Sequence, residues 1–520
     1  NFRLTLGLRL DQPGYPDVDE IKTHPLVSAL TFSNGEKINT GNLPGKKVMW
    51  SPRVGFNWDL YGDRSLQIRG GTGIFTGKVP FVWIVSQSGD AGLLQVTQSF
   101  NSPTTVPGPF NPNPRAYYPA VIPTAGKVIP TAIDVVTPSF KNPQSWKTSI
   151  AMDTKLPWGL IATVEAIFNK DIQTAYFRNT NLITPSALNV SGYPDSRMIY
   201  PSVSSGTNYQ QFINRLTSAG IPSPAGTTAF NAVVMDNSNK GYYFSLTAKI
   251  DKAFNKGLFA SVAYTKSMAN NLYDGNGDQP LSAWQSTQTV NGSNIPVLGY
   301  ANYVSPDRVI ATFSYRKEYI KHLATSIALF YQGAIDYRFS YVYGTDFNRD
   351  GFNGNDLIYI PRNASEITFV ANTVNGVNYS AQQQSDLFFA YVVQDKYLSK
   401  HMGQFAERNG AQAPWRNQVD VKFIQDLFAN LGKNRNTFQF TLDIFNFGNL
   451  LDPSWGKVKT INASSILIPQ NAPALVPGGA ILPTFKLATD RGNVITRTFR
   501  DNVSTISTYS IQFGLRYLFN

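Results

Sequence analysis

The feature that most constrains the fold is an alternation of apolar and polar residues with a period of two. The stretch TYSIQFGLRYLF (508–519) places Tyr, Ile, Phe, Leu, Tyr and Phe on one parity and Ser, Gln, Gly and Arg on the other, with only Leu518 out of step. The same period recurs in NFRLTLGLRL (1–10), RVGFNWDL (53–60) and FQFTLDI (438–444). A period of two indicates a β-strand with two different faces, and about nine to eleven tilted residues carry a strand across a membrane. These segments therefore predict long strands that are apolar on one face and polar on the other.

The connections between such strands alternate between short and long. This alternation is typical of outer-membrane barrels, which have tight periplasmic turns and long extracellular loops. The short connections are YGDR (61–64), PW (157–158), FNKG (254–257), KEYIK (317–321) and ANLGKNR (429–435). The predicted strands lie near 2–10, 48–60, 65–76, 145–156, 159–169, 241–252, 257–268, 305–316, 322–343, 417–428, 436–448 and 496–519. The predicted extracellular loops are 11–47, 77–144, 170–240, 269–304, 344–416 and 449–495.

We therefore predict an all-β fold, a transmembrane antiparallel β-barrel with about 12 strands in this chain. If the short turns are periplasmic, the first strand runs outward and the last runs inward, so that both chain ends are periplasmic. Twelve strands either close as a small barrel or form the second half of a larger one, because lipid does not tolerate an open sheet edge. A soluble β-sandwich or propeller is the alternative, although no blade repeat of about 40 to 50 residues is visible.

Composition supports the membrane interpretation. Charged residues make up 15% of the chain, against about a quarter in typical soluble domains. No run of about 20 apolar residues is present, which excludes a helical membrane protein. The absence of cysteine excludes disulfide scaffolds and Cys-based sites. The net charge of +12 is scattered without a basic run, so we predict no nucleic-acid partner. We expect the charge to attract an anionic lipid surface, here outer-membrane lipid and lipopolysaccharide, or an acidic ligand.

Charged residues of the strands fall on the polar parity. Arg or Lys on a lipid-facing position costs about 2–4 kcal/mol at the midplane, so this parity is predicted to face the lumen. There the charges form salt bridges across the lumen or to a plug, or they contact substrate. The set comprises Arg3, Arg9, Arg53, Arg69, Lys147, Lys155, Lys249, Lys422 and Arg516, with Asp59, Asp153, Asp251, Asp420 and Asp443.

DFNRDG (346–351) is a candidate calcium loop. Its Asp, Asn, Asp and Gly match positions 1, 3, 5 and 6 of an EF-hand loop, where oxygen side chains converge on a hard cation. Position 12 is Leu357 in place of Glu, so Asn355 or Asp356 would have to substitute. An Asx-rich turn is the alternative, and DGNGD (274–278) is a weaker match. The predicted ligands of a structural Ca2+ are Asp346, Asn348, Asp350 and Asp356.

No enzyme is predicted. His24, His322 and His401 are far apart and show no HExxH spacing, and neither a nucleophile elbow nor a Walker A loop is present. GGTGIFTG (70–77) nearly matches G-x-G-x-x-G, but no helix pattern follows, which favours glycines that let a strand bend. An outer-membrane protease or lipase is disfavoured because no His-containing constellation is apparent.

Several stretches resemble the barrel of a TonB-dependent outer-membrane receptor of the Bacteroidota Oar-like type. Such receptors have 22-stranded barrels, preceded by a plug domain and a TonB-contacting segment, and their aromatic terminal strand is similar to the signal read by the barrel-assembly machinery. The resemblance implies that this sequence is the C-terminal half of a plugged barrel, with the plug domain not present in it. The stretches are SPRVGFNWDLYGDRSLQIRGGTGIFTG (51–77), NPQSWKTSIAMDTKLPWGLIATVEAIFNKD (142–171), DFNRDGFNGNDLIYIP (346–361), RNQVDVKFIQDL (416–427), FQFTLDIFNFGNLLDPSWG (438–456) and the last strand.

The function that the resemblance implies is ligand capture by extracellular loops, followed by import when the TonB complex, reached through segments outside this chain, displaces the plug. Loops 77–144, 170–240 and 344–416 are the predicted places of ligand or partner contact, because binding residues concentrate on loops of rigid scaffolds. A passive 12-stranded channel, in which 2–10 pairs with 505–519, is one alternative. A surface or secretion-complex platform with lipoprotein or secretion-system partners is the other.

Overall fold

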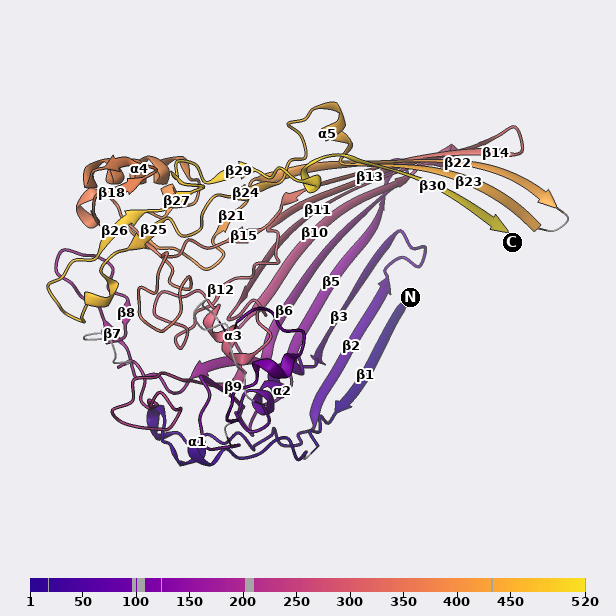
Figure 1. The fold of residues 1–520 in the computed structure, drawn as a ribbon. Helices are drawn as coiled ribbons and strands as arrows, with labels where there is room; N and C mark the ends of the chain where they lie inside the picture. Colours follow the sequence, from indigo (N-terminus) through magenta and orange to yellow (C-terminus); the bar gives the residue numbers. More distant parts are fainter. Residues whose placement is uncertain are drawn as a thin grey trace.

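The main element is one long antiparallel meander with its strands in sequence order (Figure 1). The computed structural model describes residues 1–16, 18–95, 100, 108–122, 124–201, 210–431 and 434–519. Parts of the predicted loops 77–144 and 170–240 lie outside these ranges. The twelve strands along the meander are β1 (Phe2–Asp11), β2 (Met49–Asp59), β3 (Leu66–Thr76), β5 (Gln144–Leu156), β6 (Leu160–Asn179), β10 (Tyr242–Ala253), β11 (Leu258–Asn271), β13 (Asp307–Tyr319), β14 (Leu323–Ile335), β22 (Trp415–Leu431), β23 (Asn434–Phe445) and β30 (Ser510–Phe519). The predicted all-β fold is confirmed.

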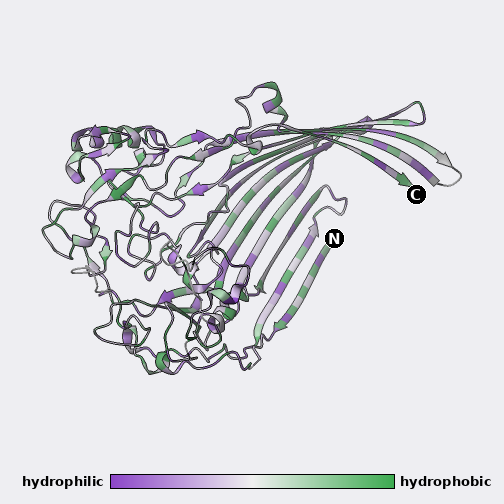
Figure 2. Ribbon diagram, viewed as in Figure 1, coloured by the Kyte–Doolittle hydropathy of each residue, from purple (hydrophilic) through white to green (hydrophobic). Residues whose placement is uncertain are grey.

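The sheet is a curved, open trough, with β1 and β30 at its two edges (Figure 1). Hydropathy alternates along its strands (Figure 2), and one face carries apolar side chains with no protein layer over them. On β1, for example, Leu6 is 70% exposed and Leu8 62% exposed. Rows of large exposed apolar side chains on a regular sheet are what contact with lipid requires.

Both termini lie at the end of the sheet that holds the short turns, and the long connections gather at the other end (Figure 1). The turn predicted as ANLGKNR (429–435) is shorter than expected, because the pairing of β22 with β23 continues to Asn430 opposite Arg435 and Leu431 opposite Asn434. Its centre, 432–433, lies outside the described residues.

Two predicted strands are too long at the loop end. The range 322–343 ends as a sheet strand at Ile335, because the chain then leaves the sheet to bury Tyr341 and Tyr343, which are 0% and 1% exposed, among the long connections. The range 496–519 pairs in the meander only from Ser510, opposite Phe445, where its partner β23 ends. Both strands are shorter than predicted for the same reason, because apolar residues beyond the membrane pack inward against other connections.

The fifth predicted strand, 159–169, is too short. β6 continues to Asn179, and its outer half pairs with β9 (Asn231–Ser238), which in turn pairs in parallel with β4 (Ala132–Val136). Polar residues such as Lys170 and Asp171 obscure the apolar period there, although the backbone of Thr174–Asn179 is paired with β9.

The long connections are residues 12–48, 77–143, 180–241, 272–306, 336–414 and 446–509. Their described residues fold together into what we call the loop body. Four clusters of buried apolar side chains lie in it and in the adjoining strand ends. No helix in the described ranges is long and apolar enough to span a membrane. The helices are α1 (Pro25–Ala29), α2 (Val82–Gly89), α3 (Pro280–Gln285), α4 (Ala381–Gln394) and α5 (Phe447–Leu451). The remaining short strands are β7 (Ser186–Ala187), β8 (Met198–Ile199), β12 (Gly299–Tyr300), β15 (Arg338–Phe339), β16 (Tyr359–Ile360), β17 (Thr368–Phe369), β18 (Asn372–Val374), β19 (Val377–Tyr379), β20 (Gln404–Phe405), β21 (Ala411–Gln412), β24 (Lys459–Ile461), β25 (Leu467–Pro469), β26 (Thr484–Leu487), β27 (Thr489–Asp490), β28 (Asn493–Val494) and β29 (Phe499–Asp501).

Candidate functional site

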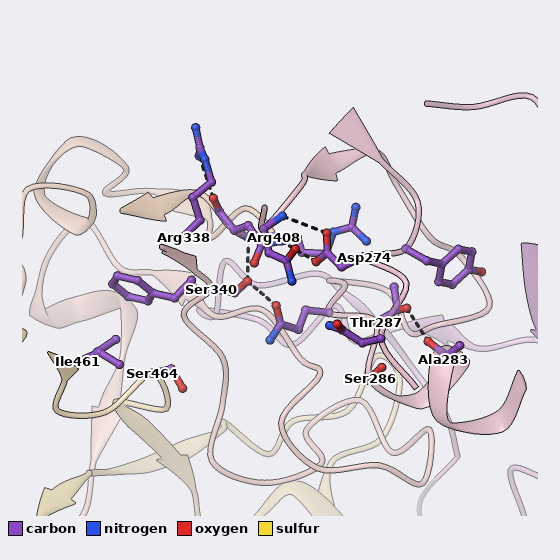
Figure 3. Close-up of a pocket in the computed structure, with 15 residues that line it drawn as sticks. Asp274, Ala283, Ser286, Thr287, Arg338, Ser340, Arg408, Ile461 and Ser464 are labelled. Atoms are coloured by element: carbon purple, nitrogen blue, oxygen red, sulfur yellow. Dashed lines mark hydrogen bonds between the residues drawn. The ribbon is translucent and has the colours of Figure 1, made fainter. Parts of the chain in front are cut away.

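The loop body encloses a polar cavity of about 290 Å3 (Figure 3). Its walls include Asp274 from the connection 272–306, Ser464 from the connection 446–509, and Arg338, Ser340 and Arg408 from the connection 336–414. Hydrogen bonds hold these walls together: the Asn409 side-chain amide donates to Asp274 Oδ2 (2.7 Å), and Arg338 donates to the Asn409 carbonyl (3.0 Å). The cavity is therefore a junction between connections that are distant in the sequence.

Arg408 is the most deeply buried charged group at this cavity, at 4% exposure. Its guanidinium donates to the carbonyl oxygens of Leu272 and Asn271 and to the Asn271 side-chain oxygen (2.7 Å). Burial lowers the pKa of Arg408, but a guanidinium remains charged at physiological pH. The cavity thus offers fixed donors, a positive charge and a carboxylate to a polar ligand.

A second cavity, of about 650 Å3, lies where the loop body meets the sheet. Aromatic and charged side chains line it, among them Tyr300, Arg338, Tyr397, His401 and Trp415. The Arg338 guanidinium carbon lies 4.5 Å from the centre of the Tyr300 ring, and His401 stacks on Tyr397 with ring centres 4.0 Å apart. Such walls suit a ligand that has both an apolar and a charged part.

The candidate calcium loop lies in the connection between β14 and β22, inside the loop body. Asp346 Oδ2 accepts the N–H of Gly351 (2.9 Å), and the Asn348 side-chain oxygen accepts the N–H of Asp350 (2.8 Å). Gly351 has a φ of +99°, which side-chain-bearing residues rarely adopt. The chain therefore turns tightly around these side chains.

Asp356 closes this loop from its far end. Its Oδ2 accepts the N–H of Phe347 (2.7 Å), while its Oδ1 has no hydrogen bond and lies 3.8 Å from Arg197 Nη1. The Asn355 amide donates to Asp350 Oδ2 (3.0 Å), and its own Oδ1 has no hydrogen-bond partner. Both residues that could replace the missing Glu thus reach the loop, and the four predicted metal residues Asp346, Asn348, Asp350 and Asp356 lie together.

The carboxyl groups of this loop are poorly solvated. Burial raises the pKa of Asp346, Asp350 and Asp356 above the usual range, and repulsion from Asp350 adds to the rise at the other two. Across the residues that the structure describes, no three His, Cys, Asp or Glu side chains form a metal-binding group on their own. A cation at this loop would therefore draw on amide, hydroxyl or backbone oxygens as well.

Sequence reasoning missed the neighbours of this loop in SGYPDSRMIY (191–200). Arg197 and Asp195 form an ion pair of 2.9 Å with both side chains fully buried, and Arg197 also donates to the carbonyl of Leu357 (2.7 Å). Tyr200 is fully buried beside the loop, and its N–H donates to the Asn348 carbonyl (2.8 Å). No motif or period marks this stretch, so the sequence held no signal for it.

The weaker motif, DGNGD (274–278), does not form a second loop of this kind. Asp274 accepts from the N–H of Asn302 (3.1 Å) and from Asn409, which ties it to neighbouring chain segments. Asp278 is exposed and accepts from the Ser282 hydroxyl (3.2 Å).

Several of the predicted lumen charges pair along the polar face of the sheet. Arg69 binds Asp153 (3.0 Å) and Glu165 (3.4 Å). Further pairs are Lys249 with Asp251 (2.8 Å) and Lys422 with Asp443 (2.7 Å). These contacts favour salt bridging over substrate contact for the paired residues.

The three histidines do not meet. His24 caps α1 by accepting the N–H of Val27, and His322 bonds the carbonyl of Phe428. His401, stacked in the second cavity, lies 3.7 Å from Glu407. Each has a local structural partner, and no triad with a nucleophile arises among them.

An antiparallel meander of this length, with an exposed apolar face and a polar face of paired charges, defines the sheet of a membrane β-barrel. The chain belongs to the outer membrane β-barrel domain family, whose model matches residues 1–467. This is a family of membrane barrels, and membership places the chain in the outer membrane. No curated protein sequence matches the chain.

Solved structures to which the chain is similar include the following three. The outer membrane transporter YddB from Escherichia coli is 10% identical with a TM-score of 0.35, over 80% of this chain and 38% of that protein. Two variants of the ferric enterobactin receptor PfeA from Pseudomonas aeruginosa are 8% and 7% identical, each with a TM-score of 0.34, over 91% of this chain and 40% of the receptor. The chain thus spans about two-fifths of the length of these proteins.

Proposed function

We propose that this chain is part of a TonB-dependent outer-membrane transporter, which captures a ligand with its loop body and imports it through the barrel. In this proposal the termini and short turns are periplasmic and the loop body is extracellular. The plug and the TonB-contacting segment are supplied by polypeptide outside this sequence. The sequence resemblance to Oar-like receptors supports the proposal.

The observation that carries the proposal is the pair of open edges. Within the described residues, β1 pairs only with β2 and β30 only with β23. A strand edge in lipid leaves N–H and C=O groups without partners, each at a cost of several kcal/mol. Additional strands that complete the sheet would produce a wider barrel, and barrels of about 22 strands have a lumen that holds a plug.

The cavities of the loop body support the capture step. Both lie between connections on the side of the sheet away from the termini. Their walls combine fixed charges, hydrogen-bond donors and aromatic rings, the groups that orient small ligands.

The test begins with the intact mass of the protein purified from its native outer membrane. A mass tens of kilodaltons above the 57.5 kDa of this chain supports a plugged barrel. A mass near 57.5 kDa would replace the proposal with a passive channel in which β1 pairs with β30.

TonB dependence is tested next, by measuring solute uptake in cells that lack TonB or are treated with a protonophore. Coupled import predicts that uptake stops while surface binding persists. Unchanged uptake would refute coupling. Copurification of large extracellular partners with no bound solute would favour the surface or secretion platform instead.

A further inference from the structure

We propose that the loop Asp346–Asp356, together with the neighbouring Tyr200, binds one Ca2+ ion that locks three connections of the loop body together. The proposal concerns a structural metal site and does not depend on import. It would hold equally in a channel or in a surface platform.

The ligands of the site are oxygens. Asp346, Asn348 and Asp350 project into one turn, and Asp356 and Asn355 approach it from the other side. Ca2+ takes about six to eight oxygen ligands from carboxylates, amides, carbonyls and water in flexible geometry. Mg2+ demands a near-octahedral shell and keeps several waters, which a buried loop with this many protein oxygens does not favour.

Charge balance supports a divalent cation. The loop and its neighbours bury carboxylates at Asp195, Asp350 and Asp356, which are all 0% exposed, and Asp346 is half-buried beside them. The nearby guanidinium groups are those of Arg197 and Arg349. Arg197 pairs with Asp195 and lies 3.8 Å from Asp356 Oδ1, and Arg349 donates to the carbonyls of Ala472 and Leu475. Four carboxylates thus face two guanidinium groups, and an uncompensated buried charge is costly. One Ca2+ would supply the missing charge.

Buried polar atoms without hydrogen-bond partners provide independent support. Asn355 Oδ1 and Asp356 Oδ1 lie in residues that are 1% and 0% exposed, and neither accepts a hydrogen bond. Tyr200, from a different connection, is fully buried, and its hydroxyl is also unpartnered. A Cβ placed on Gly292 would lie 3.7 Å from that hydroxyl and 3.5 Å from Asn348 Nδ2, so the hydroxyl and the Asn348 side chain both lie beside Gly292. Buried polar groups are normally satisfied, and a bound cation would satisfy these oxygens.

The ion would sit where three connections meet. Tyr200 donates its N–H to the Asn348 carbonyl (2.8 Å), and Thr289 donates its N–H to the Asn355 carbonyl (2.8 Å). The N–H of Leu357 in turn donates to the Thr289 carbonyl (2.9 Å). Binding would therefore stabilise the packing of residues 195–200, 287–294 and 343–358 against one another.

The experiment is calorimetric titration of CaCl2 into the full-length protein in detergent, after removal of metal with EGTA. We expect one ion per protein, with a Kd on the order of 10⁻⁴ to 10⁻³ M, as in extracellular calcium modules. Asp350→Asn and Asp356→Asn should each weaken binding at least about tenfold. Asp278→Asn, the same change in the exposed DGNGD motif, is the matched control and should bind as the unmodified protein does.

A readout on the unmodified protein keeps the test independent of whether the variants fold. Ca2+ should slow protease cleavage within residues 343–358 at concentrations where Mg2+ has no effect. The absence of both a binding heat and this protection would overturn the proposal. So would unchanged binding by folded Asp350→Asn and Asp356→Asn proteins, or an equal loss in Asp278→Asn.

Discussion

The assignment of the two sheet faces is tested by placing the same charge on adjacent residues of β11. Val262 is 55% exposed on the apolar face and lies at the middle of the stretch Leu258–Lys266 that pairs with β13. Ser261, the preceding residue, points to the polar face and lies opposite Asp251 on β10. Val262→Arg therefore puts a guanidinium into the lipid at the midplane, and Ser261→Arg puts it beside a carboxylate.

The expected difference is large. Arg on the lipid face at the midplane costs about 2–4 kcal/mol, whereas a half-exposed charge next to a carboxylate changes stability by about 0–1 kcal/mol. At about 1.4 kcal/mol per factor of ten, Val262→Arg should lower the folding equilibrium constant by roughly 30- to 700-fold. Ser261→Arg should lower it by less than about fivefold.

The assay is reversible guanidinium unfolding of the full-length protein in phospholipid bilayers, with the gel mobility of unheated samples as the measure of the folded fraction. The two variants share strand, depth and substituent, so the difference between them reports the face alone. Equal destabilisation, or a larger effect of Ser261→Arg, would refute the assignment of the apolar face to lipid.

Three further outcomes are expected. Arg69→Ala removes the ion pairs with Asp153 and Glu165, all partly exposed, so unfolding in bilayers should change by at most about 1 kcal/mol; a loss above about 2 kcal/mol would indicate a dry, buried network instead. Trp284 is 1% exposed in the loop body, so Trp284→Ala should lower the free energy of unfolding of the loop body by about 3–5 kcal/mol. The loss would be seen as faster protease cleavage of the connections while the gel band of the folded barrel stays unchanged. Burial raises the pKa of Asp134 from 3.8 to about 8, so the folded state holds a proton that the unfolded state loses, and the stability of the loop body falls as pH rises between these values. Asp134→Asn should therefore raise the thermal midpoint of the loop body at pH 8 and leave it unchanged below pH 4; an equal effect at both pH values would contradict this reasoning.

The sheet could be predicted from the sequence because each of its strands has two different environments. Lipid on one side and polar contacts on the other impose a period of two, and TYSIQFGLRYLF became β30 on that basis. The period fails where the environment becomes uniform. The outer half of β6 pairs with β9 beyond the meander, and residues 336–343 enter the loop body, so their strand boundaries were wrong.

The candidate metal loop was likewise predictable from the sequence only in part. The spacing of DFNRDG is local, and the structure keeps its side chains on one turn. Arg197 and Tyr200 reach that turn only through tertiary folding, and the bond from Arg197 to Leu357 spans 160 positions. A contact of this kind leaves no periodic trace, because it depends on how the connections pack and on no property of either segment alone.

The barrel sheet and the loop body are stabilised by different interactions, which has a consequence for how specificity can change. The membrane part of the sheet has apolar side chains directed outward and no apolar cluster of its own in the described residues, so lipid and backbone pairing hold it. The loop body holds the buried clusters, such as the one built around Tyr341, Phe388 and Phe485, and is stabilised by apolar burial. Substitutions at the cavity walls, such as Ser340, therefore alter a packed surface without disturbing the strand pairing beneath it. If the loop body captures a ligand as proposed, a change of ligand can accordingly arise in the loop body alone, provided that its buried clusters keep the walls in place.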